Sequence, residues 1–254
     1  MAITPKTIPT DNPSGAIIGY DNLLTASTTS DAERVLIPNT WERYRPLSGA
    51  MSVKFQLSSV SNVNYIAIGA HGLAGETVLI QTAETIGGAL TDVESINFLD
   101  NSPVMITFDD RNIEEIALIS TLASDSEIGV IYAGNYLQMP QNIYGGHSPI
   151  SLNEDVTYQS SESEGGQILS RNIIRRGSSG VLNWELLSDV FVRNEFLDFK
   201  KSAQAKPFFI KWRPDFYSDD VLFAQTEGKI AVSNMGGGHR LMSASMKIKA
   251  HSDL

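Results

Sequence analysis

The chain has 254 residues, 42% of them hydrophobic, and a formal net charge of −10, so it is long and apolar enough to bury a sizeable core. It has no cysteine, which excludes a disulfide framework, a thiol nucleophile and a thiolate metal site. Residues 1–150 hold 6 Lys/Arg against 16 Asp/Glu, and residues 151–254 hold 13 of each. The acidic first part argues against a nucleic-acid interface there, because phosphate binding needs clustered cations.

The first 14 residues contain three prolines and no apolar periodicity, so we expect an extended N-terminal arm over residues 1–14. Such an arm could contact a neighbouring subunit or simply fray. The N-terminus lacks the apolar run of a signal peptide, and no later stretch is long and apolar enough to span a membrane. We therefore expect a soluble protein that is made in the cytoplasm of its host and is not inserted into a membrane.

Residues 15–140 are predicted to form an antiparallel β-sandwich or jelly roll. From Met51 to Leu57 apolar and polar residues alternate, which places four apolar side chains on one face of a strand. Further short strands are expected at the spacing typical of sandwiches, with turns between them. These strands are residues 63–69, 77–82, 103–108, 115–120 and 127–134, and the turn-rich segments include residues 58–62 and 108–112.

The segment from Asn39 to Pro46 is the densest candidate for recognition. It combines flat aromatic rings with guanidinium donors just before the first strong strand, a composition suited to a sugar or a protein contact. The candidate contact residues are Trp41, Arg43, Tyr44 and Arg45, together with His71. The alternative is structural, because a tryptophan that leads into a sandwich strand usually anchors the core while nearby arginines hold loop carbonyls.

A linker is expected over residues 141–166, which contain two glycine pairs and a polar Ser/Glu tract. Residues 167–254 then predict a smaller α+β module, a sheet with one packed helix. Its expected strands are residues 166–176, 207–212, 221–226, 228–234 and 241–250, with a hairpin loop between the last two. The fold class is thus mainly β, a sandwich followed by an α+β module.

The one predicted helix runs from Ser188, a suitable N-cap, to the residues before Pro207. Two apolar stripes follow its surface, where one sheet face needs only one. The first stripe contains Val192, Phe196, Phe199 and Ala203, and the second contains Leu186, Val190 and Leu197. We expect the second stripe to pack on another element or subunit, or else the helix to lie deeper in its own domain.

Tests for catalytic templates give no candidate. The glycine clusters lack the spacing of a phosphate-binding loop, no GxSxG elbow is present, and the four histidines are too scattered for a zinc motif. The carboxylate pairs Asp109–Asp110 and Glu114–Glu115 place adjacent side chains on opposite faces of a strand, unlike a glycosidase pair. The sequence predicts a protein that is not an enzyme and has no cofactor and no metal site.

Two segments resemble known families. Residues 40–73, TWERYRPLSGAMSVKFQLSSVSNVNYIAIGAHGL, resemble the galactose-binding-like, discoidin-type jelly roll, in which some members bind carbohydrate and others are structural. Residues 182–212, with a helix followed by Pro-Phe-Phe, and the final strand at 242–251 look like minor and distal tail proteins of bacteriophages. In those proteins the equivalent sheet packs into rings. This chain departs from the pattern in order, because the ring-forming module usually comes first there and follows the sandwich here.

The resemblance to tail proteins implies a structural component of a bacteriophage virion, in the tail, baseplate or neck, that assembles into a multimeric ring or complex. Its expected partners are other virion proteins and further copies of itself, and its expected location is the virion tail. The alternative is a carbohydrate-binding module that attaches the particle to host surface glycans.

Overall fold

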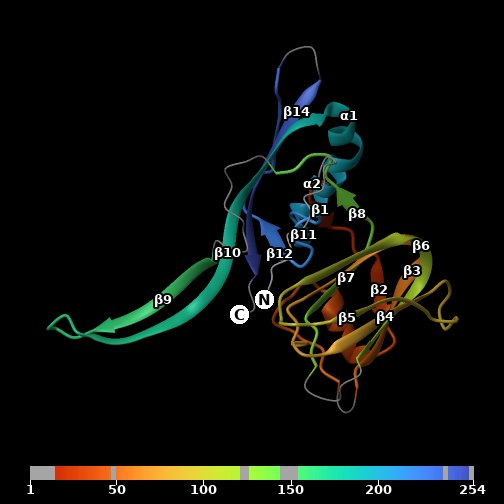
Figure 1. The fold of residues 1–254 in the computed structure, drawn as a ribbon, viewed down its shortest axis with the longest axis horizontal. Coiled ribbons are helices and arrows are strands. Elements are labelled where there is room, and N and C mark those ends of the chain that lie inside the picture. Colours follow the sequence, from red (N-terminus) through yellow and green to blue (C-terminus); the bar gives the residue numbers. More distant parts are fainter. Residues whose placement is uncertain (1–14, 47–49, 121–125, 144–153, 237–239, 252–254) are drawn as a thin grey trace, which may run out of the picture.

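The computed structural model describes residues 15–46, 50–120, 126–143, 154–236 and 240–251. They form two antiparallel sheets, a 3₁₀ helix η1 (Ser30–Leu36), a second helical segment that follows β10, and a long projecting hairpin (Figure 1). The mainly β fold with a packed helix, as predicted, is confirmed. The N-terminal arm predicted for residues 1–14 lies outside the described residues. Within the described ranges, no helix has the length and apolarity that crossing a membrane requires.

The first sheet, which we call sheet B, belongs to the predicted sandwich. Its strand order is β2-β3-β6-β4-β5, and β7 also pairs with β3. The strands are β2 (Leu24–Ser27), β3 (Ser52–Gly69), β4 (Thr77–Ala83), β5 (Thr91–Asn97), β6 (Val104–Ser120) and β7 (Val130–Gly134). The alternation from Met51 to Leu57 is confirmed, since Met51, Val53, Phe55 and Leu57 are all buried in one core.

Two predicted turns in the sandwich are wrong. Residues 58–62 lie inside β3 and residues 108–112 lie inside β6, where Ser61 pairs with Ile113 and Asn62 pairs with Asn112. The register between the two strands shifts twice near these residues, so the ribbon is bulged there. Polar residues with turn propensity are tolerated because the bulged part of the ribbon is largely exposed.

The second sheet, sheet A, has the order β8-β1-β11-β12-β14-β10-β9, with β13 also beside β14. Its strands are β1 (Ile17–Gly19), β8 (Tyr136–Gln138), β9 (Glu154–Glu162), β10 (Ile168–Ser188), β11 (Phe208–Lys211), β12 (Val221–Thr226), β13 (Ala231–Asn234) and β14 (Leu241–His251). β1 and β8 pair with each other, and β1 pairs with β11. The sheet of the second module therefore includes two strands from the predicted sandwich range 15–140.

The predicted linker, residues 141–166, contains ordered structure. Residues 154–162 form β9, which pairs with β10 along its length. The polar composition that suggested a linker is explained by exposure, since β9 has no buried residue. Residues 144–153 lie outside the description.

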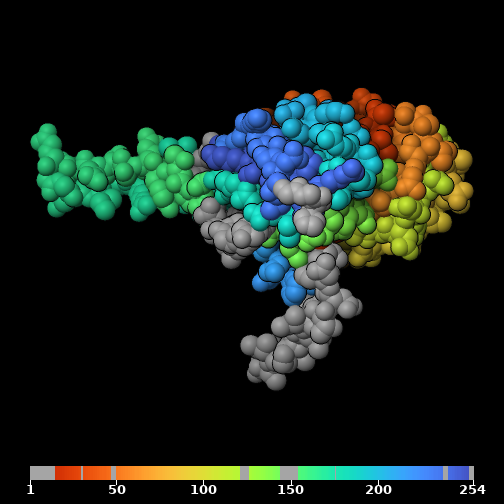
Figure 2. Space-filling model, turned by 90° about the horizontal axis from the view of Figure 1, so that it is seen from above, coloured from red at the N-terminus to blue at the C-terminus, as the bar shows by residue number. Residues whose placement is uncertain are grey.

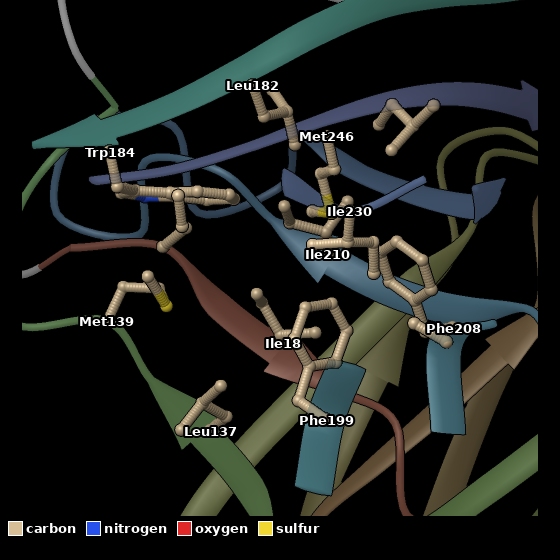
Figure 3. Packing of buried hydrophobic residues seen from close by; sticks show 14 of the residues in the cluster. Ile18, Leu137, Met139, Leu182, Trp184, Phe199, Phe208, Ile210, Ile230 and Met246 are labelled. Atoms are coloured by element: carbon tan, nitrogen blue, oxygen red, sulfur yellow. The ribbon is translucent and has the colours of Figure 1, made fainter. Parts of the chain in front are cut away.

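The helix begins and ends as predicted. It comprises α1 (Asp189–Phe191), a π-helical turn η3 (Val192–Phe196) and α2 (Leu197–Ala203). The Ser188 hydroxyl oxygen accepts the Phe191 N–H at 3.1 Å, which caps the helix. Its first stripe, Val192, Phe196, Phe199 and Ala203, is buried against sheet A in a core that also contains Trp184, Phe208 and Ile210 (Figure 3).

A third apolar cluster joins the two parts of the molecule. It contains Tyr65, Met105 and Tyr132 from the sandwich and Phe209 and Phe223 from sheet A. The Tyr65 hydroxyl donates to the Asp21 carbonyl at 2.5 Å, and the Tyr132 hydroxyl donates to the Pro207 carbonyl at 3.1 Å. Because these tyrosines are buried and hydrogen-bonded, the sandwich and sheet A share a packed interface.

Candidate functional site

The strands β9 and β10 leave the body of the protein as a long ribbon. β10 pairs with β14 only from Gly177 to Ser188, whereas it pairs with β9 from Ile168 to Ser178. We call residues 154–176 of this ribbon the arm. The part of the arm beyond Gly177 is therefore two-stranded within the described part of the chain. It extends far from the body in both views (Figures 1 and 2). A two-stranded ribbon is only marginally stable in water without further packing.

The arm exposes an unusual amount of apolar surface. Tyr158 and Ile173 are directly opposite each other and share one face, and the Arg171 guanidinium lies 3.8 Å from the centroid of the Tyr158 ring. Five large apolar side chains of the arm are 46% to 73% exposed, namely Tyr158, Ile168, Leu169, Ile173 and Ile174. A concentration of this kind on a narrow ribbon marks an interaction surface.

Two irregularities in the ribbon present further apolar side chains. The register shifts between Ile168 and Ser170 and between Ile173 and Arg175, which leaves Leu169 and Ile174 without a residue opposite them on β9. Bulges of this type bend and twist a strand and redirect its side chains. Both bulges of the arm therefore carry an exposed apolar side chain.

The two edges of the arm differ in charge. On the β10 side, residues 168–176 contain three arginines and no Asp or Glu, whereas β9 contains three acidic residues and no Lys or Arg. The described cationic side chains are those of Arg171 and Arg176, and the acidic set is Glu154, Asp155 and Glu162. In the described chain neither edge of the ribbon beyond Gly177 pairs with a further strand.

The second apolar stripe of the helix is not sunk into its own domain. Leu186 and Val190 are more than half exposed, and Leu197 is partly exposed. Leu186 has a left-handed backbone with φ of 59° and stands in a bulge of β10. The bulge lets Trp184 and Leu187 point into the same core, although they are three residues apart on the strand.

Trp41 is displayed at the surface. Its side chain is 90% exposed, and its backbone N–H donates to the Asn39 side chain at 3.0 Å. The expectation that this tryptophan anchors the core is therefore wrong. An indole exposed to this extent gains nothing from burial within the chain, so it is available to a partner.

The other members of the predicted recognition segment form an internal bridge. Tyr44 is buried, and its backbone pairs with Ile128 through bonds of 2.8 and 3.0 Å. Arg43 and Arg45 lie on either side of it, and both bind Glu127, with the Arg45 contact at 2.8 Å. Burial alone raises the pKa of Glu127, but the two arginines outweigh it and hold that pKa below its ordinary value. These arginines fasten the segment to the sandwich.

His71 is fully buried. Its Nε2 lies 2.8 Å from the Ser102 carbonyl oxygen, and its ring packs edge-on against Phe98 with centroids 4.9 Å apart. It lies in the sandwich and lines neither cleft described below. Among the aromatic rings of the five predicted contact residues, those of Tyr44 and His71 are buried and only that of Trp41 is exposed to solvent.

A cleft of about 360 Å³ adjoins the residues before Trp41, between the sandwich and the foot of the arm. Its lining includes Asn39, Thr40, Gln225, Arg176 and Lys249. No carboxylate is found among its described lining residues, although the chain as a whole is acidic. Arg176 is 3.7 Å from Glu154, an ion pair at the root of the arm.

The sequence reasoning predicted a strand at residues 166–176 but missed the arm. One signal was available, because the neighbouring residues 154–162 are almost entirely polar. A polar partner strand cannot cover isoleucines, so apolar residues paired to it have to find cover elsewhere.

No protein-family model matches the chain, and no curated protein matches its sequence. Solved structures give weak similarities. Chitosan-binding module 1 of a chitosanase/glucanase from Paenibacillus sp. IK-5 is 16% identical, with a TM-score of 0.40 over 46% of this chain and 98% of that chain. The module CBM32-1 of a family 31 glycoside hydrolase from Clostridium perfringens is 11% identical, with a TM-score of 0.37 over 46% and 99%.

A truncated AlyQ with CBM32 and alginate lyase domains is 14% identical, with a TM-score of 0.40 over 69% of this chain and 50% of that chain. Similarity of this degree does not indicate what the present chain binds.

Proposed function

We propose that this chain is a structural subunit that assembles with further copies of itself through the arm, as a component of a bacteriophage tail. The carrying observation is the projecting ribbon with five exposed large apolar side chains. A monomer in water would leave this ribbon without a core on either face, and two strands alone are marginally stable. Leu186 and Val190 add a second exposed apolar area near the helix.

The charges of the arm favour another copy of the chain as its partner. Arg171 and Arg176 belong to β10, and Glu154 and Glu162 belong to β9. Within one chain Arg171 lies over Tyr158 and Arg176 pairs with Glu154, and a neighbouring arm laid edge to edge would bring further opposite charges together. Pairing β10 of one copy with β9 of the next continues the sheet and satisfies the unpaired backbone groups. Since two different surfaces meet, the contact is heterologous and generates either a closed ring or an open filament.

The bacteriophage setting is supported by the resemblance of residues 182–212 and 242–251 to tail proteins. In those proteins the ring-forming module usually comes first, and β1 (Ile17–Gly19), a strand of sheet A, precedes the sandwich in this chain. Mass spectrometry of purified particles from a phage that encodes the chain tests the setting. Absence of the protein from the particles contradicts it.

The assembly role is tested by light scattering coupled to size-exclusion chromatography. The full chain is expected to be multimeric, and a variant in which Asn-Gly replaces residues 156–176 is expected to be monomeric. Asp155 and Gly177 are paired, so a two-residue turn between them preserves the hairpin at its root. Val60→Ser, which changes an exposed apolar residue of the sandwich, is the control and should leave the mass unchanged.

Charge reversal tests the pairing of edges. Arg171→Glu together with Arg176→Glu is expected to dissociate the assembly, because acidic edges then face each other. Adding Glu154→Lys and Glu162→Lys to the same chain is expected to restore it. A full chain that stays monomeric at tens of micromolar, or an assembly indifferent to both changes, contradicts the proposal.

A second candidate function is attachment to a host surface glycan, and the exposure of Trp41 favours it. An uncovered indole can stack on a sugar ring, and the adjoining cleft supplies amide and cationic donors from Asn39, Gln225 and Lys249. A glycan array with the full chain and with Trp41→Ala tests this. Binding that Trp41→Ala leaves unchanged, or no binding at all, contradicts it.

A further inference from the structure

A second cleft, of about 500 Å³, lies between the sandwich and sheet A on residues that the proposed function does not use. The segment from Glu94 to Thr107 lines one wall, and Lys211, Ser218, Asp219 and Val221 line the other. Its lining is disjoint from that of the cleft near Trp41.

Lys211 is the unusual residue of this cleft. The residue is only 8% exposed, but its ammonium still reaches solvent in the cleft, and no hydrogen bond or ion pair holds that ammonium within the described chain. It stands two residues after Phe209 on β11, so both side chains leave the same face of sheet A, toward the sandwich. Burial lowers the pKa of Lys211, while the charges of Asp219 and Glu94 act in the opposite direction.

Partial burial of this ammonium costs desolvation that no hydrogen bond within the described chain offsets, and a methionine of similar shape would avoid that cost. Residues that reduce stability in this way are characteristic of binding sites. A ligand that enters the cleft and accepts a hydrogen bond from the Lys211 ammonium would offset this cost.

The other lining groups restrict which kind of ligand can bind in the cleft. Glu94, Asp100 and Asp219 disfavour an anion, and the ammonium of Lys211 disfavours a cation. A neutral ligand with several hydroxyl groups satisfies both, because each hydroxyl can accept from the ammonium and donate to a carboxylate. Ile96, Phe98 and Met105 provide apolar lining for the C–H face of such a ligand.

We propose that this cleft binds a neutral hexose unit, with Lys211 as hydrogen-bond donor and Glu94 and Asp219 as acceptors. The site depends on neither the arm nor Trp41. It combines residues of the sandwich with residues of sheet A, so neither part forms it alone.

Saturation-transfer NMR on the full chain tests the site, with methyl galactoside, methyl glucoside and methyl mannoside as neutral probes. Methyl glucuronide and glucosamine serve as the anionic and cationic comparisons. At least one neutral hexoside should bind more tightly than both charged sugars. Lys211→Met should weaken that binding by roughly tenfold or more, as expected for loss of a charged hydrogen bond.

Trp41→Ala is the matched control and should retain the binding, which distinguishes this cleft from the glycan candidate at Trp41. The oligomer mass of Lys211→Met should equal that of the unmodified chain, so the test stands apart from the assembly role. No binding of any neutral hexoside, tighter binding of a charged sugar, or equal binding by Lys211→Met overturns the proposal.

Discussion

The ribbon of β3 and β6 and the ribbon of β9 and β10 have the same local design and opposite surroundings. Both are long antiparallel pairs with two register shifts. In the sandwich the apolar side chains of the ribbon, such as Phe55 and Ile116, are fully covered, whereas on the arm Ile168 and Ile174 remain exposed. The two ribbons therefore share their strand geometry and differ in whether other elements bury their apolar side chains. The ribbon of the sandwich is covered by its own chain, whereas the apolar side chains of the arm are left uncovered within the described residues.

The largest expected change in the free energy of unfolding is in the buried core that joins the sandwich to sheet A. Phe209→Ala should lower the free energy of unfolding by about 3–5 kcal/mol, because it empties the centre of the cluster that joins sandwich and sheet A. Phe209 packs edge-on against Tyr132 with centroids 5.4 Å apart. Urea unfolding of the full chain measures the change. A loss below about 1 kcal/mol would mean that the two parts do not depend on this interface.

Lys211→Met should raise the free energy of unfolding at neutral pH by about 1 kcal/mol, because it removes a partly desolvated charge that no hydrogen bond within the described chain holds. The folded-state pKa of Lys211 lies below the unfolded value, so the unfolded chain binds more protons between the two. Stability of the unmodified chain should therefore rise with pH in that window.

Urea unfolding at about pH 7 and about pH 9.5 checks this dependence, and Lys211→Met should reduce the rise between them. Measurements should stay below pH 10. Burial raises the pKa of Tyr132 to about 12 and also raises that of Tyr65, so above the unfolded tyrosine pKa stability is lost as pH rises. An unchanged pH dependence in Lys211→Met would contradict the assignment.

Glu127→Gln should cost about 1 kcal/mol at neutral pH, because Arg43 and Arg45 lose their common carboxylate. The pKa of Glu127 is lowered on folding, so its contribution is present above the unfolded value and lost as pH falls through the folded one. The difference between variant and unmodified chain should therefore vanish in acid. Glu42→Gln, an exposed neighbour, is the control. An equal effect of both variants would contradict the stabilising role of the contacts between Glu127 and the two arginines.

The smallest expected change in stability is on the arm. Leu169→Ser with Ile174→Ser should alter the unfolding free energy of the dissociated chain by less than about 0.5 kcal/mol, since both side chains are exposed and lack cross-strand partners. The same variant should nevertheless weaken assembly in light scattering. A large loss of stability instead would show that the arm packs within its own chain.

Much of the fold is predictable from the sequence, because alternation from Met51 to Leu57 and the Ser188 cap are local signals. The two false turns arose where exposed polar residues occupy a bulged strand. The site was harder to predict. In the run Trp41-Glu42-Arg43-Tyr44-Arg45, a shift of one residue exchanges the inward and outward faces, and composition does not tell which aromatic is buried. Whether isoleucines of a strand are covered depends on the partner strand and cannot be read from the strand itself.

The pairing of β1 with β8 has one more consequence. Ile17 to Gly19 are opposite Tyr136 to Gln138, so the chain leaves sheet A at one point and returns beside it after the whole sandwich. In topological terms the sandwich is an insertion between two neighbouring strands of sheet A. Exchanging or enlarging such an insertion leaves the strand order of its host intact, because its two ends already lie side by side. The surface of the sandwich can thus change while sheet A and the arm stay the same.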